Sequence, residues 1–358
     1  MKSKLRILAI TLIMVLGCGL VSVNADEVTH YDIYINGTEL TSETPSVTAG
    51  NGTVSYNPDT NELTLDNATI TATITKDKAS TEGVISMIDP DETNVTIKLV
   101  GINTIVSTVR EIDGIYSANP NLTITGDGSL TITTDDYGVY VSTSLTVKDT
   151  TLNVTSTNGP EGLHAYDSLV IDNSAVDLRA TGAGGVAAYS DSSVRIQNLT
   201  GKVLQASNSP ITVKTDIISD PSTFDVTRGY YHYVKISNLY TVTAEWDVNS
   251  TVALETAGPS SGDAGKILAI DGDTVTATIG TADGYKIKSV LVNGKESKDS
   301  VKDGKLTFTV NGNTTLKVVS EAVEKSPNTG DEAGLYTIIA MLALLGATAT
   351  VKLSGKNN

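Results

Sequence analysis

Five segments of the chain repeat one pattern of alternating apolar residues, and this repeat limits the fold more than any other feature. They begin at Ile97, Leu122, Leu145, Leu169 and Val194, so successive starts lie 25, 23, 24 and 25 residues apart. Each segment reads apolar-x-apolar and has Gly, Asp or Asn at its fifth place, where a turn favours these residues. A unit this short cannot bury its own apolar face, so the repeat predicts coils that stack and share one core.

Two further markers keep the same period. Gly114, Gly138, Gly162 and Gly185 each precede a short apolar segment, and the stretches SLTIT, TLNVT, AVDLR and GKVLQ follow the turns. Three short strands per coil predict an all-β fold, a right-handed parallel β-helix of about 24 residues per coil. The pattern leaves one alternative open, an antiparallel sandwich of similar strands.

The stretch before the regular coils has turns and a coil-like pattern of its own. Asn36-Gly37 and Asn57-Pro58-Asp59 separate alternating segments, and LTLDNATITA repeats the coil pattern with Asn67 at the corner. We therefore expect residues 26–82 to form a cap and a first coil, and residues 83–238 to form the repeated coils. The cap would cover the unpaired strand edge at the open end.

A different alternating pattern follows the coils. Residues 239–322 contain four or five alternating segments, with turns at Asn293-Gly294 and at Asn311-Gly312-Asn313. Short strands joined by such turns predict a small β-sandwich. Modules of this kind act as spacers in bacterial surface proteins, which this part of the chain resembles.

The N-terminus has the pattern of a secretory signal peptide over residues 1–25. Lys2, Lys4 and Arg6 precede an apolar run, and the small residue Ala25 offers a cleavage site. Two alternatives stay open, an uncleaved membrane anchor and a lipoprotein whose sole cysteine, Cys18, is acylated. Cleavage after Ala25 would leave a secreted chain without cysteine and without disulfides.

The C-terminal region 323–358 combines a short motif, an apolar stretch and a basic tail. Residues 335–351 are uncharged and just long enough to cross a membrane, and lysines follow them. The motif before them is Ser326, Pro327, Asn328, Thr329 and Gly330. This arrangement resembles the cell-wall sorting signal of Gram-positive surface proteins, although leucine is commoner than Ser326 at the first motif position.

That resemblance implies two partners and a location. A sortase would cut between Thr329 and Gly330 and join Thr329 covalently to peptidoglycan. The expected location is the cell wall at the surface of a Gram-positive bacterium. The Ser326 departure leaves the class of sortase open.

Charge and composition exclude some functions. The chain carries 25 basic and 41 acidic residues, a formal net charge of −16, so nucleic acid is not an expected partner. The three histidines, His30, His164 and His232, are too far apart in sequence to indicate a metal motif, and no phosphate-binding glycine loop occurs. Uncharged glycans and calcium remain compatible with the acidity.

Acidic residues in the coils raise the hypothesis of a polysaccharide lyase or hydrolase. Such enzymes use paired carboxylates, or carboxylates with a basic residue and calcium. Asp135 and Asp136 are weak calcium candidates, so calcium is the one cofactor considered. Turns favour Asp for backbone reasons, which makes a structural role the more economical interpretation. The full set of candidates is Asp127, Asp135, Asp136, Asp149, Asp172 and Asp177, with Lys148, Arg179 and Arg195 as basic partners.

Four aromatic residues follow the glycine markers and are the candidate glycan-binding residues. Tyr116, Tyr140 and His164 each stand two places after their glycine, and Tyr189 stands four places after Gly185. Stacked coils would align them in a column spaced by about 4.8 Å. A column that faces solvent could bind a glycan, whereas one that faces inward would be part of the core.

Residues 31–210 resemble the carbohydrate-binding β-helix proteins of Gram-positive bacteria. The resemblance rests on YDIYINGTEL, GTVSYNPDTNELTLDNATI, VTIKLVGINTI and GIYSANPNLTITGDGSLTI. It implies adhesion to a polysaccharide or host glycan, assisted by calcium, without catalysis. Three hypotheses follow: a wall-anchored glycan-binding adhesin, a polysaccharide lyase or hydrolase, and a structural surface protein with no specific ligand.

Overall fold

The computed structural model describes residues 27–77, 79–89, 94–118, 120–209, 216–218, 231–256 and 265–324. The chain divides into two compact units, with the division after Leu239. In these described parts the regular structure is strands, apart from two 3-10 turns at Ala79–Thr81 and Lys298–Ser300. The predicted signal peptide and the Ser326–Gly330 motif lie outside the described residues.

The first unit is a parallel β-solenoid built from three sheets, which confirms the predicted stack of coils. Sheet A runs in the order β2 (Thr38–Thr41), β1 (His30–Ile35), β7 (Gly83–Met87), β10 (Asp113–Ser117), β13 (Val139–Val141), β16 (Glu161–Ala165) and β19 (Val186–Ser190). Sheet B runs β3 (Ser46–Ala49), β4 (Gly52–Asn57), β5 (Glu62–Asp66), β8 (Asn94–Val100), β11 (Asn121–Thr125), β14 (Ser144–Lys148), β17 (Ser168–Asp172) and β20 (Ser193–Gln197). Sheet C begins β6 (Thr69–Thr71), β9 (Ile102–Val106), β12 (Ser129–Thr134), β15 (Thr151–Ser156) and β18 (Ala175–Ala180).

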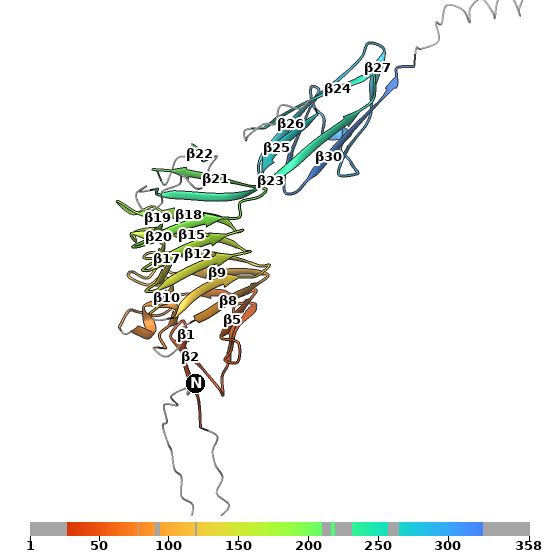
Figure 1. Cartoon of the computed structure of the whole chain (residues 1–358). Coiled ribbons are helices and arrows are strands. Elements are labelled where there is room, and N and C mark those ends of the chain that lie inside the picture. The colour runs from red at the N-terminus through yellow and green to blue at the C-terminus, as the bar shows by residue number, and fades with distance from the viewer. Residues whose placement is uncertain are drawn as a thin grey trace, which may run out of the picture. The chain divides into compact units, whose positions relative to one another are not determined.

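Successive coils pair in parallel, so each residue lies beside its counterpart in the next coil (Figure 1). Inward-facing Leu, Ile and Val therefore form continuous columns, for example Ile97, Ile124, Val147 and Ile171 in sheet B. All four are buried in a single core cluster. Right-handedness of the solenoid stays a prediction.

The predicted corner residues adopt the backbone conformation that the turn requires. The φ angle is +65° at Gly101, +118° at Gly126, +49° at Asp149, +46° at Asn173 and +57° at Asn198. Left-handed backbone of this kind favours Gly and tolerates Asn and Asp, which explains the residue choice at the fifth place of each segment.

The predicted register of the first two segments was wrong by two residues. Leu122 pairs with Val95, and Ile97 pairs with Ile124, so this step of the solenoid spans 27 residues. The extra residues lie between β9 and β10, where Ile105 and Ile115 are 10 positions apart, against 7 for their counterparts Ile132 and Val139 in the next coil. At the corner Gly126-Asp127-Gly128, the Gly128 amide donates to the Leu99 carbonyl. Apolar alternation has a period of two, so a shift by two keeps every side chain on its face and is invisible in sequence.

The last predicted coil was also wrong in part. The segment GKVLQ lies in β21 (Lys202–Ser207), which does not stack on β18. Instead, the first part of β23 (Tyr233–Trp246) lies antiparallel between β18 and β21, and β22 (Asp216–Ile218) pairs with the other side of β21. An antiparallel strand at this point covers the edge that a stack of parallel coils leaves unpaired.

In the N-terminal region β5 and β6 pair in parallel with the next coil, and antiparallel hairpins accompany them. The role of these hairpins as a cap stays a prediction. Asn67 has a φ of +50° at its corner, and β5 pairs in parallel with β8. The β1–β2 hairpin turns at Asn36-Gly37, and β1 lies antiparallel on β7.

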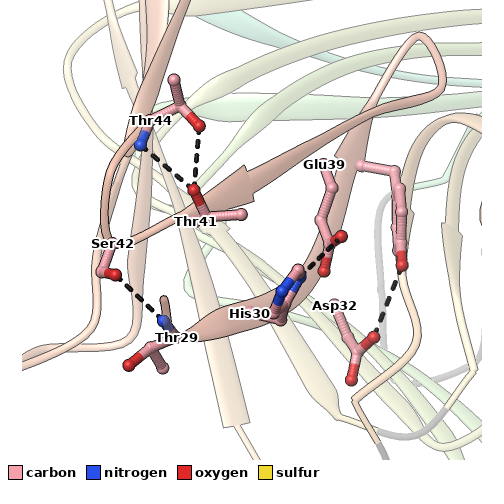
Figure 2. A network of polar contacts seen from close by, with 8 residues as sticks. Thr29, His30, Asp32, Glu39, Thr41, Ser42 and Thr44 are labelled. Atoms are coloured by element: carbon pink, nitrogen blue, oxygen red, sulfur yellow. Dashed lines mark hydrogen bonds and ion pairs between the residues drawn. The ribbon is translucent and has the colours of Figure 1, made fainter. Parts of the chain in front are cut away.

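Hydrogen bonds between polar side chains and backbone join β1, β2 and the residues beside them (Figure 2). The His30 Nδ1 atom lies 2.9 Å from Glu39 Oε2, and the Thr29 amide donates to the Ser42 hydroxyl at 3.0 Å. The Thr44 amide donates to the Thr41 hydroxyl at 3.1 Å. Charged and polar groups on an edge strand discourage pairing with another chain.

The second unit contains two sheets. One joins β28 (Lys295–Glu296), β27 (Tyr285–Val292), β30 (Thr314–Ala322) and the second part of β23, with β25 (Lys266–Ile270) beside β23. The other joins β24 (Ser250–Thr256), β26 (Thr274–Thr281) and β29 (Lys305–Thr309) in antiparallel order. Asn293 and Gly294 both have positive φ and form the predicted two-residue hairpin between β27 and β28. The designation of this unit as a β-sandwich stays a prediction.

Gly114, Gly138 and Gly162 occupy one column in sheet A, where two walls of the coil approach closely. A Cβ atom at Gly138 would lie 2.0 Å from the Val154 side chain and 2.5 Å from the Gly162 carbonyl. The predicted fourth marker, Gly185, is out of register, because Val186 pairs with Glu161 and so Ala187 takes the place beside Gly162. Close packing therefore explains why Gly114, Gly138 and Gly162 carry no side chain.

We predict that Gly138→Ala lowers the free energy of unfolding by about 1–3 kcal/mol, the usual cost of forcing an extra methyl group into a packed core. Denaturant unfolding of the full chain measures this difference. Gly312→Ala is the matched control, since no atom lies within 4 Å of the added methyl group. Equal stability of the two variants would contradict the packing explanation.

Candidate functional site

The four candidate aromatic residues form a continuous ladder across sheet A. Tyr116 pairs with Tyr140, Tyr140 with His164, and His164 with Tyr189 in the strand register. The ring centroids lie 5.6, 4.7 and 5.5 Å apart along this series, with interplanar angles of 12°, 3° and 28°. We call these four residues the aromatic ladder.

The aromatic ladder faces away from the core of the solenoid. In β10 the flanking residues Ile115 and Ser117 are buried, whereas Tyr116 between them is partly exposed. The same alternation holds for Tyr140 between Val139 and Val141. Since side chains alternate across a strand, buried neighbours on both sides place the ladder on the outer face.

Stacking determines which part of each ring is available to a ligand. The rings of Tyr140 and His164 cover each other at 4.7 Å, so a sugar cannot stack on the interior faces of the ladder. The ladder instead presents ring edges, with tyrosine hydroxyls that donate and accept hydrogen bonds.

Two of these hydroxyls have no hydrogen-bond partner among the described residues, those of Tyr116 and Tyr140. The Tyr189 hydroxyl donates to Asp191 Oδ1 at 2.9 Å. The ring of Tyr137 packs edge-on against Tyr140 and His164, at centroid distances of 5.2 and 5.6 Å. The ladder is thus a half-buried strip with polar edges.

A second column beside the ladder contains two buried carboxyl groups. Asp113, Tyr137 and Glu161 stand immediately before Gly114, Gly138 and Gly162, and so lie at equivalent places in three coils. Asp113 is 6% exposed, and the Glu161 side chain is 14% exposed. Sequence reasoning missed these acids, although their fixed place before the glycine markers was a usable signal.

Burial disfavours the charged form of both carboxyl groups. It raises the pKa of Asp113 well above its usual range, and the charge of nearby Asp136 raises it further. It also raises the pKa of Glu161 to about 7, against a lowering effect of the Tyr137 hydrogen bond. Lys76, 2.8 Å from Glu82, lowers the pKa of Asp113 and Asp136 but does not reverse either shift.

Two buried polar atoms at the aromatic ladder face each other without forming a hydrogen bond. The Oε2 atom of Glu161 and the Nδ1 atom of His164 are buried, lie 4.0 Å apart, and have no hydrogen-bond partner among the described residues. Burial lowers the pKa of His164, so the imidazole ring stays neutral more readily than an exposed one.

The carboxylates proposed for catalysis do not gather at one place. Asp149 and Asp172 lie at the corner between sheets B and C, where they accept hydrogen bonds from Asn173 (2.8 Å) and Asn198 (2.5 Å). The corner side chains thus bond along the solenoid axis, although Asn198 contacts Asp172 and not Asn173. These contacts give the corner acids a structural role.

The remaining catalytic candidates are dispersed. Asp177 accepts two hydrogen bonds from Arg179, whose guanidinium also lies 5.0 Å from the ring centre of Tyr233. Arg195 pairs with Val170 across sheet B, so it does not adjoin Arg179. Lys148 lies 4.0 Å from Asp149 at the corner, and Asp127 belongs to the corner described above.

The calcium candidates lie between β12 and β13. Asp135 Oδ1 accepts a hydrogen bond from Asn158. The charge of Asp136 contributes to the raised pKa values of Asp113 and Glu161. In the described ranges no group of three or more His, Cys, Asp or Glu side chains is arranged to hold a metal ion.

Comparison with known proteins gave no match to a family model, to a curated protein or to a solved structure. Within the part of the chain that the structure describes, no helix is long and apolar enough to span a membrane. The predicted membrane segment 335–351 lies outside that part.

We predict that the buried Glu161 carboxyl makes stability depend on pH. Its pKa is about 7 when folded against an ordinary 4.5, so its contribution to stability is full below about 4.5 and is lost as the pH rises through about 7. Glu161→Gln cannot ionise and should gain about 1–2 kcal/mol over the natural chain between pH 5 and pH 8, less than the full shift implies because the carboxyl keeps some solvent contact.

Denaturant unfolding at the two pH values measures this gain. Glu111→Gln, at a side chain that is 61% exposed, controls for the loss of one negative charge. A Glu161→Gln difference that is independent of pH would contradict the assignment.

Proposed function

We propose that this chain is a non-catalytic adhesin of the Gram-positive cell wall that binds an uncharged polysaccharide or host glycan along the aromatic ladder. The sorting motif Ser326–Gly330 supports anchoring, with sortase as the enzyme and Thr329 as the residue joined to peptidoglycan. Recovery of the chain in purified peptidoglycan after boiling in detergent tests the anchor. The second unit then acts as a spacer between the wall and the solenoid.

The outward orientation of the aromatic ladder is the observation that carries the glycan-binding proposal. The unpartnered hydroxyls of Tyr116 and Tyr140 and the edge of His164 form a row of hydrogen-bonding groups, with ring centroids 5.6 and 4.7 Å apart. Sugar hydroxyls both donate and accept, so a chain of sugars lying along the solenoid axis can bond to several of these edges. A few placed polar groups on an aromatic surface are typical of ligand sites.

Charges around the ladder favour an uncharged glycan over an anionic one. Asp136 and Asp191 lie beside the ladder, and Lys76, the nearby cation, is paired with Glu82. Carboxylates without a spare cation repel uronic acids and sulfated sugars. Uncharged hydroxyl groups do not incur this cost.

The two other hypotheses lack comparable support. A lyase or hydrolase needs an assembled pair of carboxylates or a carboxylate beside a basic residue, and the candidates Asp127, Asp149, Asp172 and Asp177 are dispersed or hold structural bonds. A surface protein without a ligand would not require an outward row of stacked tyrosines with unpartnered hydroxyls. We therefore rank the adhesin first.

We predict that Tyr116→Phe combined with Tyr140→Phe weakens glycan binding about tenfold, since two hydrogen bonds are lost while the ring stack is retained. Retention of the full chain on immobilised cellulose, chitin, xylan and mucin glycans measures this, with calcium and with chelator. Comparison of carboxymethyl cellulose with hydroxyethyl cellulose separates charge from backbone type.

Tyr285→Phe in the second unit is the matched control and should bind like the natural chain. Binding to none of the glycans in either condition would contradict the adhesin proposal. Undiminished binding by the double variant would move the site away from the ladder.

A further inference from the structure

Glu161 and His164 form an unusual pair in the middle of the aromatic ladder. They stand three residues apart across β16, and their facing atoms Oε2 and Nδ1 are buried without a partner at 4.0 Å. That distance is too long for a hydrogen bond, yet a shift of about 1 Å would bring the two atoms into bonding range. Buried polar groups normally have partners, so this gap requires an explanation.

The two atoms can bond only if one proton lies between them. A carboxylate oxygen and an unprotonated Nδ1 are both acceptors and cannot bond to each other. A protonated Glu161 can donate to Nδ1, and an Nδ1–H group can donate to a Glu161 carboxylate. The proton must therefore be on one of the two partners, and its position fixes which His164 tautomer is present.

Burial and the neighbouring acids raise the pKa of Glu161, and the Tyr137 hydrogen bond opposes them only in part. Asp136 and Asp191 are the charged neighbours of Glu161, and Asp191 is that of His164. Tyr137 contacts both members, through a hydrogen bond to Glu161 and through its ring against His164. No cation is among these neighbours, so burial and the surrounding acids favour the protonated carboxyl.

The stacked neighbours of His164 hold its ring in a fixed plane. Tyr140 lies parallel at 4.7 Å on one face, and Tyr189 lies at 5.5 Å on the other. Nδ1 is the ring nitrogen that lies 4.0 Å from Glu161 Oε2, and the other nitrogen, Nε2, has no hydrogen-bond partner among the described residues.

We propose that Glu161 is a positioning residue that sets the tautomer of His164, and thereby decides whether the outer edge of the ladder offers a donor or an acceptor at this place. With Glu161 protonated, its O–H bonds to Nδ1 and the ring proton sits on Nε2, which is then a donor. With Glu161 ionised, Nδ1–H bonds to the carboxylate and Nε2 is an acceptor. The change takes place near pH 7, where burial has moved the pKa of Glu161.

Imidazole nitrogen NMR of the full chain, labelled with ¹⁵N-histidine, tests this inference. The chain has only three histidines, so His30→Gln and His232→Gln variants assign the His164 signals. Between pH 6 and pH 8 we expect the His164 Nδ1 signal to move from the unprotonated to the protonated region, with Nε2 moving in the opposite direction. These two pH values lie about one pH unit below and above the expected transition near pH 7.

Glu161→Gln separates this effect from simple packing. Its amide donates to Nδ1 at every pH, so we expect the Nε2–H tautomer throughout and no exchange of the two signals. Asp191→Asn removes a charge near the ring without touching Nδ1, so the exchange should persist. A His164 tautomer that is the same at pH 6 and pH 8 in the natural chain would overturn the inference, and the histidine variants serve only to assign the signals compared.

Discussion

Parallel hydrogen bonding between successive coils is the interaction on which the rest of the structure depends. It places each residue beside its counterpart in the next coil. Residues of one type at equivalent positions therefore form a column along the solenoid. Apolar residues such as Ile124 and Val147 become a continuous core, and the glycines of sheet A become a column of close approach. The aromatic ladder is the same effect on the outer face.

Much of this could be predicted from the sequence because the constraints are local and repeated. Left-handed corners at Asp149, Asn173 and Asn198 need residues that tolerate positive φ, and those residues recur at the fifth place of each segment. The ladder column followed from the place of Tyr116, Tyr140 and His164, each two residues after its glycine. These predictions depend only on a period and on backbone sterics.

Other features could not be predicted, for reasons that are physical. The 27-residue step at Val95 and Leu122 preserves the alternation of faces, so no pattern reveals it. The face of the ladder was undetermined because Gly114 and Ile115 both lie against the core, which interrupts the alternation just before Tyr116. The insertion of β23 between β18 and β21 is a pairing of segments far apart in sequence, with no local signal.

Ring stacking in the aromatic ladder limits how a ligand can bind to it. Stacking at 4.7 Å between Tyr140 and His164 removes the ring faces that sugars commonly use, but it arrays ring edges at the spacing of the coils. Burial disfavours the charged forms of Asp113 and Glu161 beside this row, which suits it to an uncharged ligand. In our proposal, Glu161 sets the tautomer of His164 and thereby decides whether this residue of the aromatic ladder donates or accepts a hydrogen bond.

The most direct test of the ladder as the binding face is a titration of the full chain, with tyrosine and histidine rings isotope-labelled, against soluble cello-, chito- and xylo-oligosaccharides. We predict that one class of oligosaccharide shifts the ring signals of Tyr116, Tyr140 and His164 together and leaves those of Tyr285 unchanged. Oligosaccharide binding that shifts Tyr285 and leaves the three ladder rings unchanged would contradict it.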